Sequence, residues 1–356
     1  MLKKINFQQP FILESGKILP EVEVAFHTYG ELNSACDNVV WVAHALTGNS
    51  DVSTWWDGFL GEKKIFDPQK WFIVCANMLG SCYGTTGPAS VNPINGQVYS
   101  KDFPLVTIRD MIKVHEMLAE YLGVKVIHMA IGGSMGGQQI LEWKVAFPNR
   151  INHLVLLASN AFHSPWGIAF NEAQRMAIEA GLLSKNEEVL KKGLEAARAI
   201  GMLSYRNYET FFRTQSEEQE KISDFKAASY QQYQGQKLSR RFNPYSYITL
   251  SKAMDSHHIG RGRGGIEKVL TKIHSKTLVI GIKSDILFPI REQELISRYI
   301  PESSLQIIDS PFGHDGFLIE YPRIATIIRP LLEKDKLIPS TIYTGEILAL
   351  PGSEEF

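Results

Sequence analysis

The chain has 356 residues, of which 44% are hydrophobic and 10% aromatic, and its 37 Lys and Arg residues nearly balance its 38 Asp and Glu residues. This apolar content excludes an intrinsically disordered chain, and the length suffices for one large domain or two modest ones. A formal net charge of -1 argues against nucleic acid or an anionic membrane surface as a partner.

The cysteine pattern and the N-terminus indicate a cytoplasmic protein. Cys36, Cys75 and Cys82 are odd in number and form no CxxC pair, so the sequence predicts neither a disulfide framework nor a thiolate metal site. Polar residues interrupt residues 1–20 where a signal peptide needs an apolar run. Apolar runs are also shorter than the roughly 18 residues of a membrane span.

Short β-branched and aliphatic runs recur along the chain between helix-length segments. They cover residues 38–43, 71–75, 124–129, 153–158 and 277–281, with a shorter run at 305–308. Such near-continuous hydrophobicity is typical of strands buried on both faces of a parallel sheet. Residues 107–122 have apolar side chains at helical spacing, and Gly123 ends that helix. The alternation predicts an α/β fold with a mostly parallel, doubly wound sheet.

The alternation stops in the middle of the chain. Between residues 165 and 272 the sequence is rich in helix formers and charged residues. The most helix-like stretches are 171–182, 186–199 and 217–234. We predict a helical lid at 165–272, inserted into a core formed by 1–164 and 273–336. Residues 337–356 are rich in proline and glycine, and we expect a peripheral C-terminal tail.

The sharpest local signal is the segment GGSMGG at 132–137, which holds Ser134. It follows a predicted strand and precedes a helix-like run, which is the context that a G-x-S-x-G nucleophile elbow requires. In such an elbow a strained turn exposes the serine hydroxyl, and small neighbours let the strand and helix pass closely.

Two further residues complete a catalytic triad in the order expected of an α/β-hydrolase. That fold places an acid after a late strand and a histidine in a loop near the end of the domain. Asp285 follows the strand at 277–281, and His314 lies in a late glycine-flanked loop. Asp309 is a rival for the acid, but Asp285 follows the longer buried strand. The sequence therefore predicts the α/β-hydrolase fold.

Each predicted residue has a chemical task. Ser134 needs a neutral imidazole, His314, to accept its proton, and Asp285 would orient that imidazole and stabilise its cation. An oxyanion hole takes the backbone N–H after the nucleophile, here Met135, and a second N–H from the loop after an early strand. The segment HALTG at 44–48 is the matching loop, and we expect Leu46 to be its donor.

At this point the chain resembles the homoserine O-acetyltransferases, which are acyltransferases of the α/β-hydrolase superfamily in methionine biosynthesis. The resemblance extends from Phe26 to Leu318 and rests on specific stretches. These are HALTG at 44–48, NMLGSCYGTTGP at 77–88, the elbow with LEW after it, RGRGG at 261–265 and GHDGFL at 313–318. The family often has Met where Gln138 stands, and Asp where His257 or His258 stands, which puts the acyl pocket in doubt at Gln138.

The resemblance implies transfer of an acetyl group from acetyl-CoA to the hydroxyl of L-homoserine through an acyl-serine. By position, Arg198 would hold the acceptor's carboxylate, Tyr205 would line the same pocket, and Asp315 would meet the acceptor's ammonium. Small-molecule substrates, no permanently bound cofactor and a homodimer are implied as well.

Several alternatives stay open on the residues alone. Another acyl donor such as succinyl-CoA, serine as the acceptor, or a plain esterase or thioesterase would use the same triad. Asp315 is also a plausible helix cap. Arg261 and Arg263 fit either CoA phosphates or an ordinary exposed basic loop. Cys82 is better explained as a small structural residue than as a nucleophile.

Overall fold

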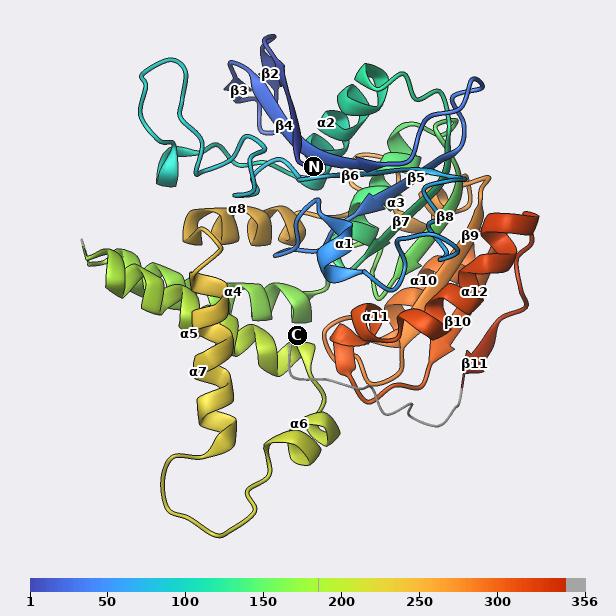
Figure 1. Ribbon diagram of the computed structural model, residues 1–356. Helices are drawn as coiled ribbons and strands as arrows, with labels where there is room; N and C mark the ends of the chain where they lie inside the picture. Colours follow the sequence, from blue (N-terminus) through green and yellow to red (C-terminus); the bar gives the residue numbers. More distant parts are fainter. Residues whose placement is uncertain (185, 344–356) are drawn as a thin grey trace.

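The structure is a computed structural model that describes residues 1–184 and 186–343, in which strands and helices alternate (Figure 1). The strands are β1 (Lys3–Phe7), β2 (Phe11–Ile12), β3 (Ile18–Leu19), β4 (Val22–Tyr29), β5 (Val39–Ala43), β6 (Phe72–Ala76), β7 (Ile127–Gly133), β8 (Ile151–Leu157), β9 (Lys276–Ile282), β10 (Ser303–Ile308) and β11 (Thr341–Tyr343). The α-helices are α1 (Val52–Trp55), α2 (Ile108–Tyr121), α3 (Met135–Ala146), α4 (Pro165–Leu182), α5 (Glu187–Tyr205), α6 (Tyr208–Gln215), α7 (Lys226–Ser239), α8 (Pro244–Asp255), α9 (Ile266–Leu270), α10 (Ile290–Tyr299), α11 (Gly316–Ile319) and α12 (Tyr321–Lys334).

Within the described chain, nine strands form one sheet in the order β1-β4-β6-β5-β7-β8-β9-β10-β11. All pairings from β6 to β11 are parallel, and only β4 pairs in the antiparallel sense, with β1 and β6. The prediction of a mostly parallel sheet is therefore confirmed. β5 and β7 are neighbours, so the loop after β5 and the turn after β7 meet at the same edge, where open α/β sheets bind their ligands.

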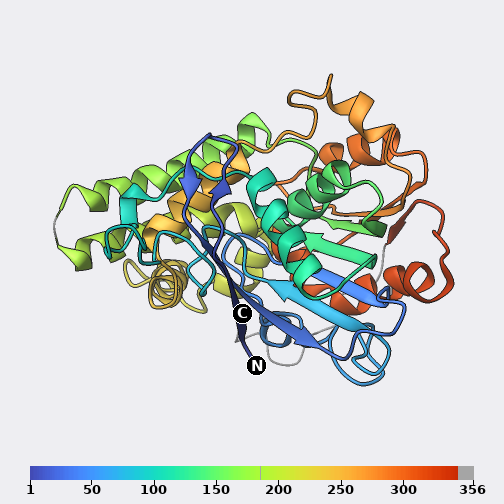
Figure 2. The ribbon, with the colours of Figure 1, turned by 90° about the horizontal axis from the view of Figure 1, so that it is seen from above.

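The central strands are buried on both faces, as their continuous hydrophobicity predicts. Side chains alternate between two apolar cores along β5, with Trp41 in one core and Val42 in the other. Helices α2, α3 and α10 cover one face of the sheet and α12 covers the other (Figure 2). Trp41 meets Trp143 of α3 edge to face, with ring centroids 4.9 Å apart. Since both indoles are fully buried, replacing either with Ala would cost about 3–5 kcal/mol.

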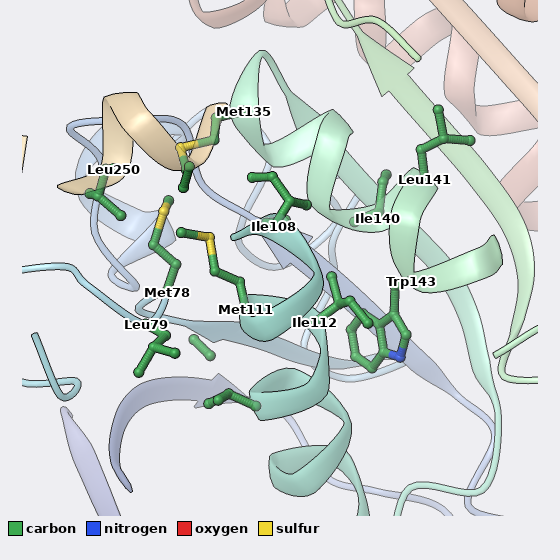
Figure 3. Close-up of a cluster of buried hydrophobic side chains, with 14 of the residues drawn as sticks. Met78, Leu79, Ile108, Met111, Ile112, Met135, Ile140, Leu141, Trp143 and Leu250 are labelled. Carbon is green, nitrogen blue, oxygen red and sulfur yellow. The ribbon is translucent and has the colours of Figure 1, made fainter. Parts of the chain in front are cut away.

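One buried cluster fixes the start of α3, the helix that follows Ser134. Met135 of α3 lies near Met78 from the loop after β6, Met111 of α2 and Leu250 of α8 (Figure 3). All four of these side chains are buried. The first turn of α3 therefore packs against both the core and a helix from the middle of the chain.

The middle of the chain is helical, and α4, α5 and α7 extend away from the sheet (Figure 1). Helix-like residues at 217–225 are wrongly predicted, because α7 begins only at Lys226. The chain before α7 is irregular, and the Glu217 carboxylate accepts the Lys226 backbone N–H at the start of that helix. In the segment predicted as a tail, β11 pairs with β10; residues 344–356 lie outside the described residues.

Candidate active site

Ser134 occupies a strained turn between the end of β7 and the start of α3. Its φ of 54° and ψ of -125° are unusual for a residue with a side chain, and such conformations cost about 1–3 kcal/mol. The turn is held by hydrogen bonds from Ser134 N–H to Leu157 O at 2.9 Å and from Ser159 Oγ to Ser134 O at 2.8 Å. The Ser134 hydroxyl makes no capping bond to α3 within the described chain.

The glycines around Ser134 are required by close approach of the backbone. A Cβ on Gly132 would overlap the backbone of Gly136, the second residue of α3. A Cβ on Gly136 would overlap the carbonyl of Ala43 at the end of β5. The GGSMGG segment therefore lets strand, helix and the neighbouring loop come together at one point, as expected of a nucleophile elbow.

Asp285 and His314 are directly bonded. His314 Nδ1 lies 2.6 Å from Asp285 Oδ2, and the Asp285 Oδ1 atom accepts the backbone N–H groups of Leu287 at 2.8 Å and Phe288 at 2.9 Å. Both side chains are about 5% exposed or less. Since a carboxylate can only accept, His314 Nδ1 carries the hydrogen, and its Nε2 atom is the one able to take up a proton.

Aromatic rings enclose the His314 imidazole. The ring of Phe288 stacks on it with centroids 4.9 Å apart, and the rings of Phe317 and Tyr205 lie at 5.3 Å and 5.9 Å. A Cβ on Gly133, the residue before Ser134, would overlap the Phe317 ring. Phe317 therefore contacts both the imidazole and the peptide that carries the nucleophile candidate, so the structure brings the three predicted triad residues to one place.

The two predicted oxyanion donors also lie at this place. Leu46 follows β5 and Met135 opens α3, and both are buried. The close packing of Gly136 against Ala43 sets the loop beside the first turn of α3. From the turn between α7 and α8, an Arg241 nitrogen donates to the carbonyl of Thr47 at 2.8 Å, so the helical segment also contacts the loop.

The residues that the resemblance assigns to the acceptor gather around His314. The Arg198 guanidinium lies 5.2 Å from the centre of the Tyr205 ring, and Tyr205 in turn faces His314. Burial raises the pKa of the Tyr205 hydroxyl; Arg198 opposes this rise and Asp315 adds to it. A Cβ on Gly313 would overlap the Tyr205 carbonyl, so the loop of His314 packs directly on the end of α5.

Asp315 has a partner that the sequence did not reveal. Arg206, the residue after α5, places Nε 3.0 Å from Asp315 Oδ2, and both side chains are mostly buried. The ion pair ties the loop of His314 to the helical segment. An arginine directly after Tyr205 was visible in the sequence, but nothing in its spacing pointed to residue 315.

A buried polar network behind the elbow was also missed. Gln138 Nε2 donates to Asn160 Oδ1 at 2.9 Å, and Asn160 Nδ2 donates to Glu292 Oε2 at 2.9 Å. Burial raises the pKa of the Glu292 carboxyl, and the nearby Asp285 carboxylate adds to this rise. The available signal was a polar residue shortly after a buried strand, since Asn160 follows β8 much as Asp285 follows β9.

The rival residues have other partners. Asp309 pairs with Lys283 at 2.8 Å. Burial raises the pKa of the Cys82 thiol, which disfavours the reactive thiolate. Within the described residues, no group of three or more His, Cys, Asp or Glu side chains could hold a metal ion. In the same part of the chain, no helix is long and apolar enough to cross a bilayer.

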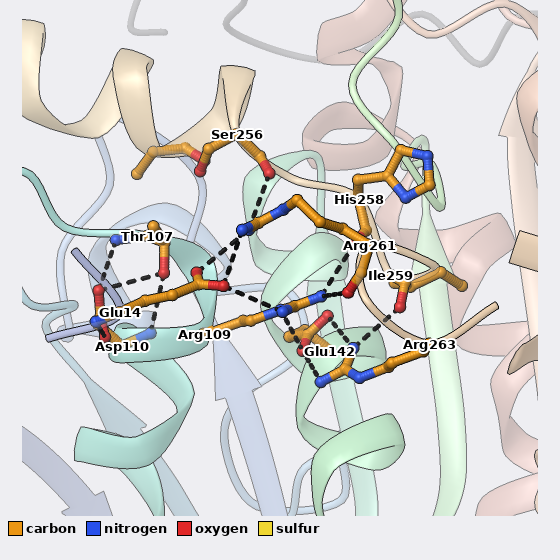
Figure 4. A network of polar contacts seen from close by, with 11 residues as sticks. Glu14, Thr107, Arg109, Asp110, Glu142, Ser256, His258, Ile259, Arg261 and Arg263 are labelled. Atoms are coloured by element: carbon orange, nitrogen blue, oxygen red, sulfur yellow. Dashed lines mark hydrogen bonds and ion pairs between the residues drawn. The ribbon is translucent and has the colours of Figure 1, made fainter. Parts of the chain in front are cut away.

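The arginines of RGRGG are ion-paired. Arg263 bonds both carboxylate oxygens of Glu142, one of them at 3.0 Å, and Arg261 lies 2.8 Å from Glu14 (Figure 4). Arg109 of α2 joins the two pairs, at 3.0 Å from Glu14 and 3.3 Å from Glu142. Glu142 is almost fully buried, so these contacts are structural ties between α2, α3 and the segment after α8.

A cavity of about 540 Å³ lies elsewhere, at the opposite edge of the sheet. Its lining includes His153 near the start of β8, Lys276 at the start of β9, and Asp335 after α12. The predicted site residues stand at the carboxyl ends of the strands instead. We therefore identify the candidate site by the residues that gather around Ser134 and His314, and not by this cavity.

Comparison with known proteins agrees with this geometry. A family model described as the alpha/beta hydrolase fold matches residues 38–321. A homoserine O-acetyltransferase of Cyclobacterium marinum is 52% identical over 324 residues, covering 90% of this chain and 92% of that protein. The chain belongs to the homoserine O-acetyltransferase family. The predicted fold and the resemblance are thereby confirmed.

Solved structures show how widely this family's fold is shared. Homoserine O-acetyltransferase from Bacillus anthracis matches with a TM-score of 0.85 and 23% identity, over 94% of this chain and 98% of that one. Esterase E22 matches with a TM-score of 0.84 and 24% identity, over 94% of this chain and 100% of that one. The fold alone therefore does not separate the family from esterases, and the site's own residues must do so.

Proposed function

We propose that the protein transfers an acetyl group from acetyl-CoA to the hydroxyl of L-homoserine, forming O-acetyl-L-homoserine for methionine biosynthesis. The observation that carries this proposal is that a cation, Arg198, and an anion, Asp315, both lie near the His314 imidazole. Arg198 reaches it through Tyr205, and Asp315 follows it in the chain. A zwitterionic amino acid needs one group of each sign, whereas an esterase needs neither.

In the first half-reaction Ser134 Oγ attacks the thioester carbonyl while His314 Nε2 takes its proton. Backbone N–H groups of Leu46 and Met135 hold the oxyanion, and Asp285 stabilises the imidazolium. The carbon–sulfur bond then breaks, and the imidazolium returns the proton to the leaving thiolate. CoA departs as the thiol, and the acetyl group remains as an ester on Ser134.

In the second half-reaction the acceptor replaces CoA. Arg198 holds the carboxylate of homoserine, and Tyr205 lines the pocket. Asp315 meets the ammonium; its Oδ2 atom also pairs with Arg206, so its Oδ1 atom is the one assigned to the acceptor. His314 takes the proton of the acceptor hydroxyl, whose oxygen attacks the ester. As the ester bond to Ser134 breaks, the imidazolium returns that proton to the serine.

We assign residues 165–272 as a lid over this site, with the core at 1–164 and 273–336 and a tail at 337–356. The lid's arginine pairing with Asp315 and its contact with the loop of Leu46 support this division. A covered site excludes water, which would otherwise hydrolyse the acyl-serine. Cytoplasmic location fits the three free cysteines at 36, 75 and 82, and family membership supports a homodimer with no permanently bound cofactor.

The test is an assay of the purified protein with acetyl-CoA or succinyl-CoA, each with and without homoserine or serine. Thiol release and the acylated amino acid are measured together. We expect rapid thiol release that depends on both acetyl-CoA and homoserine, with one O-acetylhomoserine formed per thiol. Steady thiol release at the same rate without an acceptor would instead indicate a thioesterase.

A further inference from the structure

The peptide between Ala45 and Leu46 is fixed by two hydrogen bonds. The Ala45 carbonyl accepts from the His44 Nδ1 atom at 2.9 Å and from the Gly48 backbone N–H at 2.9 Å. In a trans peptide the carbonyl and the following N–H point in opposite directions within one plane. Whatever orients the Ala45 carbonyl therefore orients the Leu46 N–H, the group assigned to the oxyanion.

His44 is held in one tautomer. Its Nδ1 atom faces a carbonyl, which can only accept, so Nδ1 carries the hydrogen. Its Nε2 atom accepts the Met78 backbone N–H at 3.4 Å. His44 is 1% exposed, and burial lowers its pKa to about 4. The imidazole is therefore neutral near pH 7, and its single hydrogen is directed at the Ala45 carbonyl.

Gln139 of α3 links this loop to the other oxyanion donor. Its Nε2 atom donates to His44 O at 3.3 Å and to Met135 O at 3.2 Å, and its Oε1 atom lies 2.9 Å from His115 Nε2. The amide orientation is unambiguous, because the reverse would set an oxygen against two carbonyls. One buried side chain thus binds both the loop of Leu46 and the first turn of α3.

We propose that His44 and Gln139 are positioning residues of the oxyanion hole. His44 sets the direction of the Leu46 N–H through the Ala45 carbonyl, and Gln139 sets the distance between that loop and Met135. Neither side chain touches the acyl group. The inference rests on the assignment of Leu46 and Met135 as oxyanion donors in the proposed function.

Matched substitutions at His44 separate positioning from packing. Asn carries a nitrogen on Cγ, as the histidine ring does, so His44→Asn keeps a donor near the Nδ1 position. His44→Leu has a similar volume and no donor, and His44→Gln moves its amide one bond further out. If the Leu variant does not fold, the Asn and Gln variants still form a polar pair that differs in donor position.

The readout is the single-turnover rate of Ser134 acylation, followed with both acetyl-CoA and p-nitrophenyl acetate, together with KM for homoserine and the melting temperature. We expect His44→Leu and His44→Gln to slow acylation about 10- to 100-fold, which is part of the effect of losing a whole oxyanion donor. KM for homoserine should stay within about twofold, and His44→Asn should recover most of the rate.

The proposal would be overturned if the Asn, Gln and Leu variants were acylated at equal rates. It would also be overturned if the loss of acylation rate in each variant simply matched its loss of melting temperature. The two acyl donors separate this failure from failure of the proposed function. If the unaltered protein is acylated by p-nitrophenyl acetate but not by acetyl-CoA, the transferase assignment fails while the His44 comparison still gives its result. A Gln139→Leu variant with unchanged acylation would remove Gln139 from the proposal.

Discussion

His314 donates its Nδ1 hydrogen to Asp285 at 2.6 Å, in a site where both side chains are almost fully buried. The same carboxylate accepts two backbone N–H groups on its other oxygen, from Leu287 and Phe288. Asp285 therefore orients the imidazole and is itself held in place. This arrangement leaves Nε2 of His314 as the ring nitrogen that can accept a proton, which is what the proposed acyl-serine mechanism requires.

Replacing Asp285 with Asn should lower kcat about 1,000- to 10,000-fold with little change in KM. An amide can donate to His314 Nδ1 and so favours the wrong tautomer. Steady-state kinetics and circular dichroism check this. Asp309→Asn is the matched control, because Asp309 also follows a strand, β10, but its carboxylate pairs with Lys283. Equal losses in the two variants would argue against Asp285 as the triad acid.

We expect the strained turn at Ser134 to lower the stability of the protein although catalysis requires it. Ser134→Gly and Ser134→Ala should both lose acyl transfer. Gly relieves the positive φ of 54° and Ala does not, so the Gly variant should be more stable than the Ala variant by about 1 kcal/mol. Urea unfolding of the two variants measures the difference. A Gly variant less stable than the Ala variant would mean that the turn stores no strain.

Arg198→Ala should weaken use of the acceptor while leaving acylation of Ser134 intact. Loss of a charged hydrogen bond of about 1.5–3 kcal/mol predicts a rise in KM for homoserine of about 10- to 100-fold. Arg240→Ala, an exposed arginine at the end of α7, is the control and should behave as the unaltered protein. Equal loss in both half-reactions would contradict the assigned role of Arg198.

We expect the buried histidines to make the folded protein less stable as the pH falls. Burial lowers the pKa of His44 and His115 to about 4 and that of His257 to about 3. The unfolded chain binds these protons below about pH 6.5 and the folded chain does not, so stability is lost as the pH falls from 6.5 toward 4. Each such histidine lowers the free energy of unfolding by at most about 1.4 kcal/mol per pH unit of acidification.

Urea unfolding at pH 7, 6 and 5 checks this slope above the range in which ordinary carboxyl groups titrate. His115→Gln keeps a donor toward Gln139 and removes one titrating group, so its slope should be smaller by about one proton. A stability that does not change between pH 7 and pH 5 would show that these histidines titrate normally in the folded state.

The elements that one local sequence signal dominates were predictable from the sequence. Continuous apolar runs predicted the central strands to within a few residues, and glycines predicted the turn at Ser134. The antiparallel edge was missed, because β4 interrupts its apolar residues with Glu23 and His27 and makes a weaker strand signal. Partial burial at a sheet edge permits such residues, and only the tertiary pairing with β1 and β6 reveals the strand.

The site divides in the same way. Chain order and strand context were enough to propose Ser134, Asp285 and His314, because each of them follows a strand of the sheet, β7, β9 and β10. The ion pair between Arg206 and Asp315 was not predictable, because it joins residues 109 positions apart through the packing of α5 on a late loop. Polar networks of this kind depend on three-dimensional packing, for which the sequence carries no short-range pattern.

The acyl-serine mechanism is tested most directly by mass spectrometry of the protein after brief exposure to acetyl-CoA, with and without homoserine. Transfer through an acyl-serine predicts the added mass of one acetyl group on the peptide that contains Ser134, its disappearance on addition of homoserine, and the appearance of O-acetylhomoserine in equal amount. An acetyl group that persists when homoserine is added, or transfer that continues in the Ser134→Ala variant, would contradict it.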